Sequence, residues 1–190
     1  GFNSNINRET FKYIKSLEHE GKKVNLITIG KKSRDFFSRL MKDKIIENFI
    51  DLGSSGAGYD IAQQISNKIQ KLYNESEFDV CVFIYNQFKS AMTQTVTHQQ
   101  LIPLDLNNKE SENENKEISD SSVYIYEPDE GEILKDLLPR NVSIQIFKVL
   151  LESNAGEQGA RMVAMDNATR NAGEMIDSLT LKYNRTRQAF

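Results

Sequence analysis

The sequence predicts an α/β fold in which a doubly wound, largely parallel sheet is followed by one long C-terminal coiled-coil helix. The first observation behind this prediction is that short apolar stretches alternate with helical stretches of about 12 to 17 residues, a pattern typical of parallel sheets. The second is that about the last fifty of the 190 residues repeat their apolar positions with a heptad period and contain no strand pattern.

The first part of the chain contains the alternating elements. Apolar spacing predicts helices, and short runs of branched residues predict strands. The expected helices are 3–20, 31–42 and 59–75, and the expected strands are 24–30 and 44–52. In the second helix we expect Phe36, Phe37, Leu40 and Met41 to point inward. In the third helix Ile61, Ile65, Ile69 and Leu72 form one apolar stripe.

Three further strands are expected, and each has a different character. Residues 79–86 are apolar throughout, as in a strand covered by helices on both faces. Cys81, the only cysteine, lies in this run and is interpreted as a buried, inert side chain. Residues 93–104 alternate and are polar, which indicates an antiparallel edge strand or a hairpin arm, and residues 122–128 read as a short strand.

The C-terminal region predicts a shaft. Counting back from Phe190, apolar and small residues recur in alternating steps of four and three as far as Ala155, with Leu151 four residues further. This is the seam of a coiled coil, and fifty helical residues would extend roughly 75 Å. Gly156, Gly159 and Gly173 weaken such a helix. We therefore divide the chain into a foot domain, residues 1–138, and a shaft helix, residues 139–190.

The net charge of −3 is unevenly distributed. Residues 105–122 hold six acidic residues, two lysines and few apolar side chains, so we expect an acidic mobile loop. The remainder is close to neutral, which argues against a protein that binds nucleic acid. No apolar run approaches the ~20 residues that cross a bilayer, so no direct membrane insertion is expected.

Residues that could support catalysis are sparse. The stretch GSSGAG, residues 53–58, follows a strand and precedes a helix, but its glycine spacing does not match a phosphate-binding loop. His19 and His98 have no cysteine or paired acid at ligand spacing, so neither a metal nor a cofactor is expected. An alternative hypothesis remains a nucleotide- or small-molecule-binding protein that uses this loop and dimerises through the helix. A self-associating helical scaffold is another.

The stretch ARMVAMDNATRNAGEMIDSLTLKYNRTRQA closely resembles the C-terminal helix of the gamma subunit of rotary, F-type ATP synthases. GFNSNI, GKKSRDFF, VFIYNQFKSAMTQTVTHQQLIPL and YIYEPD resemble further segments of that family in the same order. The resemblance covers nearly the whole chain apart from the acidic segment. It implies a Rossmann-like foot domain and a long antiparallel coiled coil that forms a rotor shaft.

The resemblance also implies a function and partners. A gamma subunit is a non-catalytic central-stalk rotor of a proton-driven enzyme, and it transmits torque between the membrane c ring and the catalytic ring of alpha and beta subunits. It also contacts the epsilon (delta) subunit, peripherally at the cytoplasmic face of the bacterial inner membrane. In the family the shaft helix pairs with an N-terminal helix of the same subunit. Because that helix would precede Gly1 and the chain lacks an initiator Met, we expect a core fragment.

Two sets of shaft residues match partner-binding positions of the family. Arg187 and Gln188 in NRTRQA match residues that contact a loop of the beta subunit. Arg161 in ARMVAMDNA matches an arginine implicated in coupling lower on the shaft. From the residues alone, a solvated helix face is the favoured interpretation of Arg187 and Gln188.

A third set matches the foot of the shaft. Tyr124, Tyr126 and Glu127 in YIYEP match residues that touch the c ring and the epsilon subunit. From the residues alone, this stretch is also compatible with a strand that has one buried and one exposed tyrosine.

Overall fold

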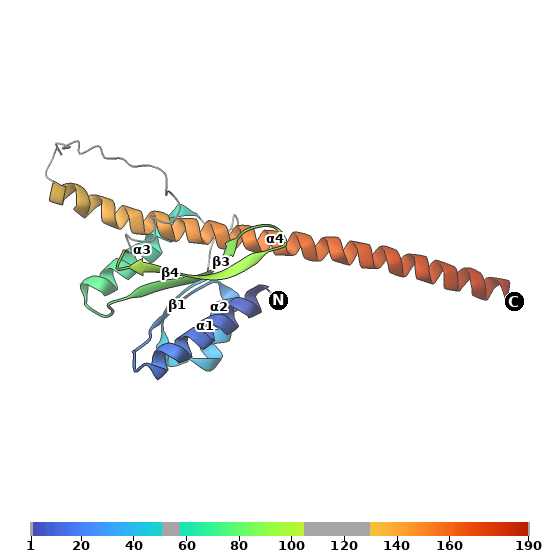
Figure 1. Cartoon of the computed structure of the whole chain (residues 1–190), viewed down its shortest axis with the longest axis horizontal. Coiled ribbons are helices and arrows are strands. Elements are labelled where there is room, and N and C mark those ends of the chain that lie inside the picture. Colours follow the sequence, from blue (N-terminus) through green and yellow to red (C-terminus); the bar gives the residue numbers. More distant parts are fainter. Residues whose placement is uncertain (1, 51–57, 105–129, 190) are drawn as a thin grey trace, which may run out of the picture.

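The computed structural model describes residues 2–50, 58–104 and 130–189 (Figure 1). In chain order the elements are α1 (Phe2–His19), β1 (Leu26–Ile29), α2 (Lys31–Leu40), η1 (Lys42–Lys44), β2 (Ile45–Phe49), α3 (Tyr59–Asn74), β3 (Cys81–Phe88), β4 (Gln94–Ile102) and α4 (Glu130–Gln188). The predicted α/β class with a long C-terminal helix is confirmed, since helices and strands alternate, parallel strands are present and one long helix follows. The described strands form separate pairs, however, and not one largely parallel sheet.

The first two strands form a parallel pair joined through α2. Leu26 lies opposite Ile45, and Ile29 lies opposite Phe49. The chain turns from β1 into α2 at Gly30, whose φ of 97° is a conformation that side chains disfavour. The backbone N–H of Gly30 also donates to the carbonyl of Phe49 at 2.7 Å, which ties this turn to the end of β2.

The other two strands form an antiparallel hairpin. β3 pairs with β4 from Cys81 opposite Ile102 to Phe88 opposite Gln94. This pairing agrees with the interpretation of residues 93–104 as a hairpin arm. The described strands therefore form two two-stranded sheets, one parallel and one antiparallel. The reason is the connection, because the few residues between β3 and β4 can join only antiparallel neighbours.

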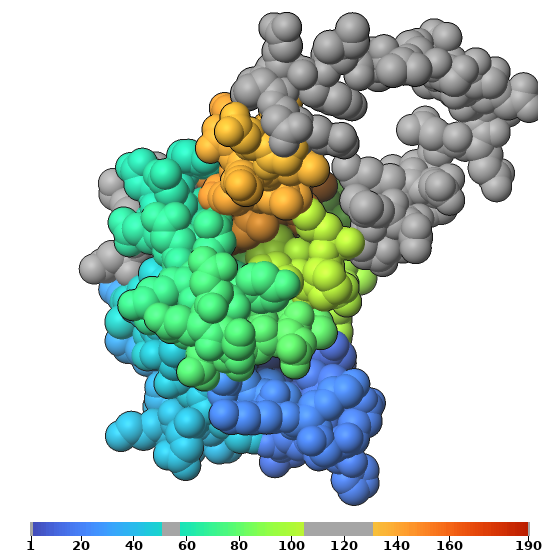
Figure 2. Space-filling model, turned by 90° about the vertical axis from the view of Figure 1, so that its left-hand side faces the viewer, coloured from blue at the N-terminus to red at the C-terminus, as the bar shows by residue number. Residues whose placement is uncertain are grey.

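The β3–β4 hairpin lies between α4 and α1, as both views show (Figures 1 and 2). Neighbouring residues of a strand point to opposite faces, so successive residues of β4 contact α1 on one face and α4 on the other. The ring of His98 packs edge-on against Tyr13 of α1, with ring centres 4.6 Å apart. The next side chain, Gln99, donates from Nε2 to Oε1 of Gln145 on α4 at 3.2 Å.

Two apolar cores stabilise these layers. The larger one joins α3, β4 and α4 through Ala62, Ile65, Ile69, Leu101, Val142, Ile146 and Leu150. The smaller one joins α1 and α2 through Ile14, Phe37 and Met41. The inward prediction was wrong for Leu40, which is 54% exposed. α1 covers the side of α2 that carries Phe37, together with Met41 just after the helix, whereas Leu40 lines a depression of about 430 Å³ at the edge of that contact.

Helix α4 begins at Glu130, before the boundary expected from the sequence, and passes through Pro139. Proline removes the N–H that would bond to the carbonyl of Lys135. The carbonyl of Pro139 itself accepts a hydrogen bond from Oγ of Ser143 at 3.1 Å. At 1.5 Å per residue, the 59 residues of α4 extend about 88 Å, and the C-terminal half projects from the domain (Figure 1).

The burial of α4 can be tested with two isoleucines that lie on opposite sides of one turn. Ile146 is fully buried in the larger core, whereas Ile144 is 51% exposed. We expect Ile146→Ala to lower the free energy of unfolding by about 2–5 kcal/mol, because it leaves a cavity. Ile144→Ala, made like Ile146→Ala in the isolated 190-residue chain, serves as the control, with a change of about 0.5 kcal/mol or less. Denaturant titration measures both, and equal losses would contradict this packing.

Cys81 provides a second test of the core. Burial raises the pKa of its thiol to about 11, so very little thiolate exists at pH 8. We expect Ellman's reagent at pH 8 to react with Cys81 of the native chain at least about 100-fold more slowly than with the denatured chain. Similar rates in the two states would show that β3 is accessible.

Candidate partner-binding surface

A seam of mostly apolar side chains, interrupted by polar residues such as Asn141, Lys148 and Gln158, runs along the outside of α4. It consists of positions spaced by alternate steps of three and four: Leu134, Leu137, Asn141, Ile144, Lys148, Leu151, Ala155, Gln158, Met162, Met165, Thr169, Ala172, Ile176, Leu179, Tyr183 and Thr186. Every one of these residues is exposed, including Met165 at 63% and Leu179 at 57%. The seam extends the predicted heptad pattern beyond Leu151 as far as Leu134, while the predicted Phe190 lies outside the described residues.

The opposite side of α4 is buried only in its first half. Val142, Ile146, Val149 and Leu150 are 7% exposed or less and face the domain. Residues 164–189 are all exposed except Asn184, which is half-buried. The first half of the helix is therefore apolar on two sides, and the described part of the domain covers one of them.

Arg187 and Gln188 lie in the last turn of α4 and are exposed. Within the residues that the structure describes, neither side chain makes an ion pair or a side-chain hydrogen bond. The guanidinium of Arg187 is thus available for a bidentate bond to a carboxylate. Both residues are far from the domain, as their place at the end of the projecting helix shows (Figure 1).

Arg161 lies lower on the helix, near the point where α4 leaves the domain. Its Nη2 is 2.6 Å from Oε1 of Glu157, and its Nη1 donates to Oε1 of Gln158 at 3.0 Å. At 1.5 Å per residue, about 39 Å of helix separates Arg161 from Arg187. The structure therefore places these two arginines at separate levels of the shaft.

Several predicted features lie outside the described residues. These are Tyr124, Tyr126 and Glu127, the expected strand 122–128, the acidic segment 105–122, and residues 53–57 of the GSSGAG stretch. Gly58, which ends that stretch, is described and precedes α3 without a side-chain cap.

A chain of hydrogen bonds between the hairpin and α4 was not predicted. The hydroxyl of Tyr85 donates to Gln99 at 3.2 Å, Gln99 donates to Gln145 at 3.2 Å, and Gln145 donates to Asn141 at 2.7 Å. Burial and the nearby carboxylate of Glu152 both raise the pKa of the Tyr85 hydroxyl. No local sequence pattern predicts this series of hydrogen bonds, because its residues come from β3, β4 and α4.

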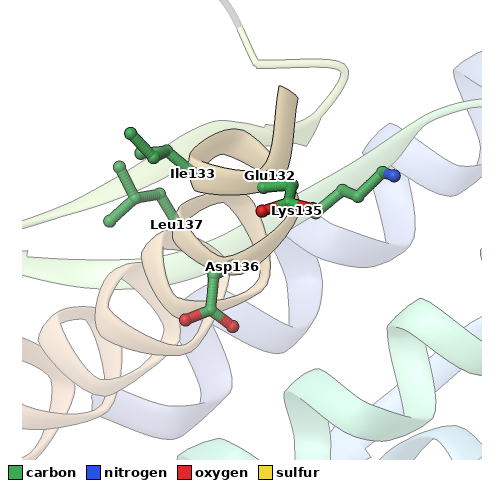
Figure 3. Close-up of a pocket in the computed structure, with 5 residues that line it drawn as sticks. All are labelled: Glu132, Ile133, Lys135, Asp136 and Leu137. Atoms are coloured by element: carbon green, nitrogen blue, oxygen red, sulfur yellow. The ribbon is translucent and has the colours of Figure 1, made fainter. Parts of the chain in front are cut away.

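Cavities and titratable clusters offer little for chemistry. A depression of about 450 Å³ at the start of α4 is lined by Glu132, Ile133, Lys135, Asp136 and Leu137 (Figure 3). All five belong to one stretch of helix, with Ile133 and Leu137 on one side and the charged groups elsewhere, so they do not converge on one point (Figure 3). Among the described residues, no cluster of three His, Cys, Asp or Glu side chains could hold a metal ion.

The same part of the chain was searched for membrane spans. None of the helices described by the structure combines the length and the apolar character that crossing a bilayer requires.

Comparison of the fold with solved structures supports the architecture. The chain matches the central stalk and c ring of Tetrahymena thermophila mitochondrial ATP synthase with a TM-score of 0.65 at 23% identity, covering 88% of this chain and 69% of that chain. It matches the rotor of Euglena gracilis mitochondrial ATP synthase with a TM-score of 0.62 at 18% identity, and the match covers 99% of this chain and 70% of that chain. At these identities the likeness concerns the fold.

Sequence comparison gives the family. The family described as ATP synthase matches residues 1–190. The ATP synthase gamma chain of Rhodospirillum rubrum is 49% identical over 191 residues, which cover all of this chain and 64% of that relative. The gamma chain of Pelagibacter ubique is 48% identical over 189 residues, with coverage of 100% and 63%. The chain thus spans somewhat less than two thirds of these relatives, and it belongs to the ATP synthase family as a relative of the bacterial gamma chains.

Proposed function

We propose that this chain is the core of a non-catalytic central-stalk rotor subunit of a proton-driven ATP synthase. In this role it transmits torque between the membrane c ring and the catalytic ring of alpha and beta subunits. The observation that carries the proposal is the exposed seam of α4, which continues without a break in spacing from the docked half of the helix to the projecting half. A helix of about 88 Å reaches well beyond a domain of this size.

The seam calls for a second helix along its whole length. Full burial of an aliphatic side chain contributes about 1.5–3 kcal/mol, so pairing would stabilise a helix that otherwise exposes Ile176 and Leu179. We take the partner to be an N-terminal helix of the same subunit, as the family resemblance implies. The position of Phe2 supports this choice, because Phe2 lies against α4 at Gly156, next to Ala155 of the seam.

Two paired helices are stiffer than one, and stiffness is what a shaft needs to transmit torque. Side chains on its outer surface press on the surrounding catalytic subunits as it turns, and this shifts each catalytic site among states of different affinity. Polar seam residues such as Gln158 and Thr169 make the seam a weak zipper, which suits a shaft that meets several partners.

Each partner is assigned to a level of the shaft. Arg187 and Gln188 contact a loop of the beta subunit, and Arg161 acts in coupling near the base. Tyr124, Tyr126 and Glu127 contact the c ring and the epsilon subunit. The complex holds the chain peripherally at the cytoplasmic face of the bacterial inner membrane.

Assembly is the direct test of the rotor proposal. The full-length subunit is expected to co-purify with alpha, beta and epsilon subunits in fixed proportion when these are expressed together. A full-length subunit that folds and yet fails to co-purify with any of them would refute the proposal.

The contact at the shaft end gives a second prediction. In the assembled complex, Arg187→Ala is expected to lower ATP turnover on the order of tenfold, as the loss of one charge-assisted hydrogen bond would. Gln188→Ala should have a smaller effect in the same direction. Arg170→Ala, which removes the same charge from an exposed Arg170–Asp166 pair, is the control. Unchanged ATP synthesis and ATP hydrolysis in both Arg187→Ala and Gln188→Ala would count against the proposed contact with the beta subunit.

The paired seam gives a third prediction. Ile176 and the adjacent Met175 are 63% and 65% exposed, but only Ile176 lies in the seam. In the isolated full-length subunit, Ile176→Ala should lower the free energy of unfolding by about 2 kcal/mol or more, because a second helix covers it. Met175→Ala should change this free energy by about 0.5 kcal/mol or less. Equal effects of the two substitutions would mean that nothing covers the seam.

A further inference from the structure

Two glycines of α4, Gly156 and Gly159, are in unusually close contact with the domain. We call this pair of residues the glycine seat. A Cβ atom at Gly159 would lie 3.1 Å from Cε2 of Phe88 and 3.2 Å from the Cα of Ala91. A Cβ at Gly156 would lie 3.3 Å from Cε2 and Cζ of Phe2 and 3.5 Å from Cγ of Gln94. Ordinary van der Waals contact to carbon begins at about 3.5 Å, so a side chain at Gly159 requires the Phe88 ring and the backbone at Ala91 to move by a few tenths of an ångström.

The seat joins parts of the domain that are distant in sequence. Phe2 is the first described residue of α1, Phe88 ends β3, and Gln94 begins β4. Because Gly156 and Gly159 are three residues apart on a helix, they lie on the same face. The start of α1 and the tip of the hairpin therefore meet on one flat patch of α4 backbone.

The turn that presses on Gly159 is held by its own hydrogen bonds. The backbone N–H of Ser90 donates to the carbonyl of Thr93 at 3.0 Å, and that of Thr93 donates back to Ser90 at 3.1 Å. Nε2 of Gln94 donates to the carbonyl of Ala91 at 2.8 Å. The contact at Ala91 is made by backbone, so a change of rotamer cannot relieve it.

The seat lies close to the end of the part of α4 that the domain contacts, with only the half-buried Ala160 and Val163 shortly beyond it. Beyond Val163, which is half-buried, the projecting residues are exposed up to residue 189 apart from the half-buried Asn184. A sideways or twisting load on the projecting half is therefore resisted at the seat. Each glycine destabilises a helix interior by about 1 kcal/mol relative to alanine. In α4 this destabilisation occurs at two positions where the missing side chain allows the domain to approach the helix backbone.

We infer that the glycine seat is the brace that fixes the rotation and the axial position of α4 relative to the foot domain, and so carries torque between them. The inference rests on the proposed rotor function for the torque, whereas the brace itself is a property of the fold. Gly173 is the matched control, since a Cβ there would meet no atom of the described residues within 4 Å.

Hydrogen exchange of the hairpin turn tests the brace in the full-length subunit. In Gly159→Ala, the amides of Lys89, Ser90 and Thr93 are expected to exchange at least about tenfold faster, because the turn is displaced from the helix. In Gly173→Ala their exchange should be unchanged, and the thermal midpoint should rise as helix propensity improves. Unchanged exchange of the turn in Gly159→Ala would overturn the inference.

A milder variant keeps the test available if Gly159→Ala does not fold. Gly156→Ala meets only the Phe2 and Gln94 side chains, so we expect a smaller increase in exchange at the amide of Thr93, which precedes Gln94, with the fold retained. In the assembled complex, both seat variants should lower the ratio of proton pumping to ATP hydrolysis, and Gly173→Ala should not. A preserved ratio together with altered exchange would overturn the role in torque. Failure of the wild-type subunit to assemble would instead refute the rotor function.

Discussion

The structure depends on the fact that α4 is apolar on two opposite sides while the described domain covers only one of them. On the covered side, Ile146 and Leu150 close the core against α3 and β4. On the other side, the seam from Leu134 to Thr186 remains exposed along the whole helix. One helix therefore forms a wall of the domain over its first half and projects beyond the domain over its second half. No other described element spans both parts of the molecule.

The contacts that hold α4 in the domain change in kind along its length. At its base the contacts are apolar, with Val142 and Ile146 packed on α3. Over the same turns, a series of hydrogen bonds from Tyr85 through Gln99 reaches Gln145. At the exit the helix offers bare backbone at Gly156 and Gly159. Apolar contacts give most of the stability, whereas directional bonds and backbone contact specify the angle and height at which the helix sits.

In the proposed rotor role, the contribution of this chain would come from this arrangement of contacts. The described residues that could react are isolated: burial raises the pKa of the half-buried Cys81 thiol, and the ring of His98 packs against Tyr13. The work proposed for this chain consists of holding one geometry under load and presenting side chains such as Arg187 at a distance. Such work requires a stiff helix, a firm base and an exposed surface, which are features of shape and charge.

The sequence by itself determined the features that depend on local periodicity. The helices α1, α2 and α3, the strands, and the heptad seam through Ile176 and Leu179 all follow from spacing, because a residue's place on a helix or strand depends on its near neighbours. The resemblance identified the family for the same reason, since its motifs are continuous stretches. Only the tertiary structure decided the start of α4 at Glu130, the exposure of Leu40, and the use of Gly159 as a point of contact. Each of these depends on which distant element packs against the residue, and residues such as Phe88 and Ala91, some seventy positions away from Gly159, leave no trace in the local pattern around it.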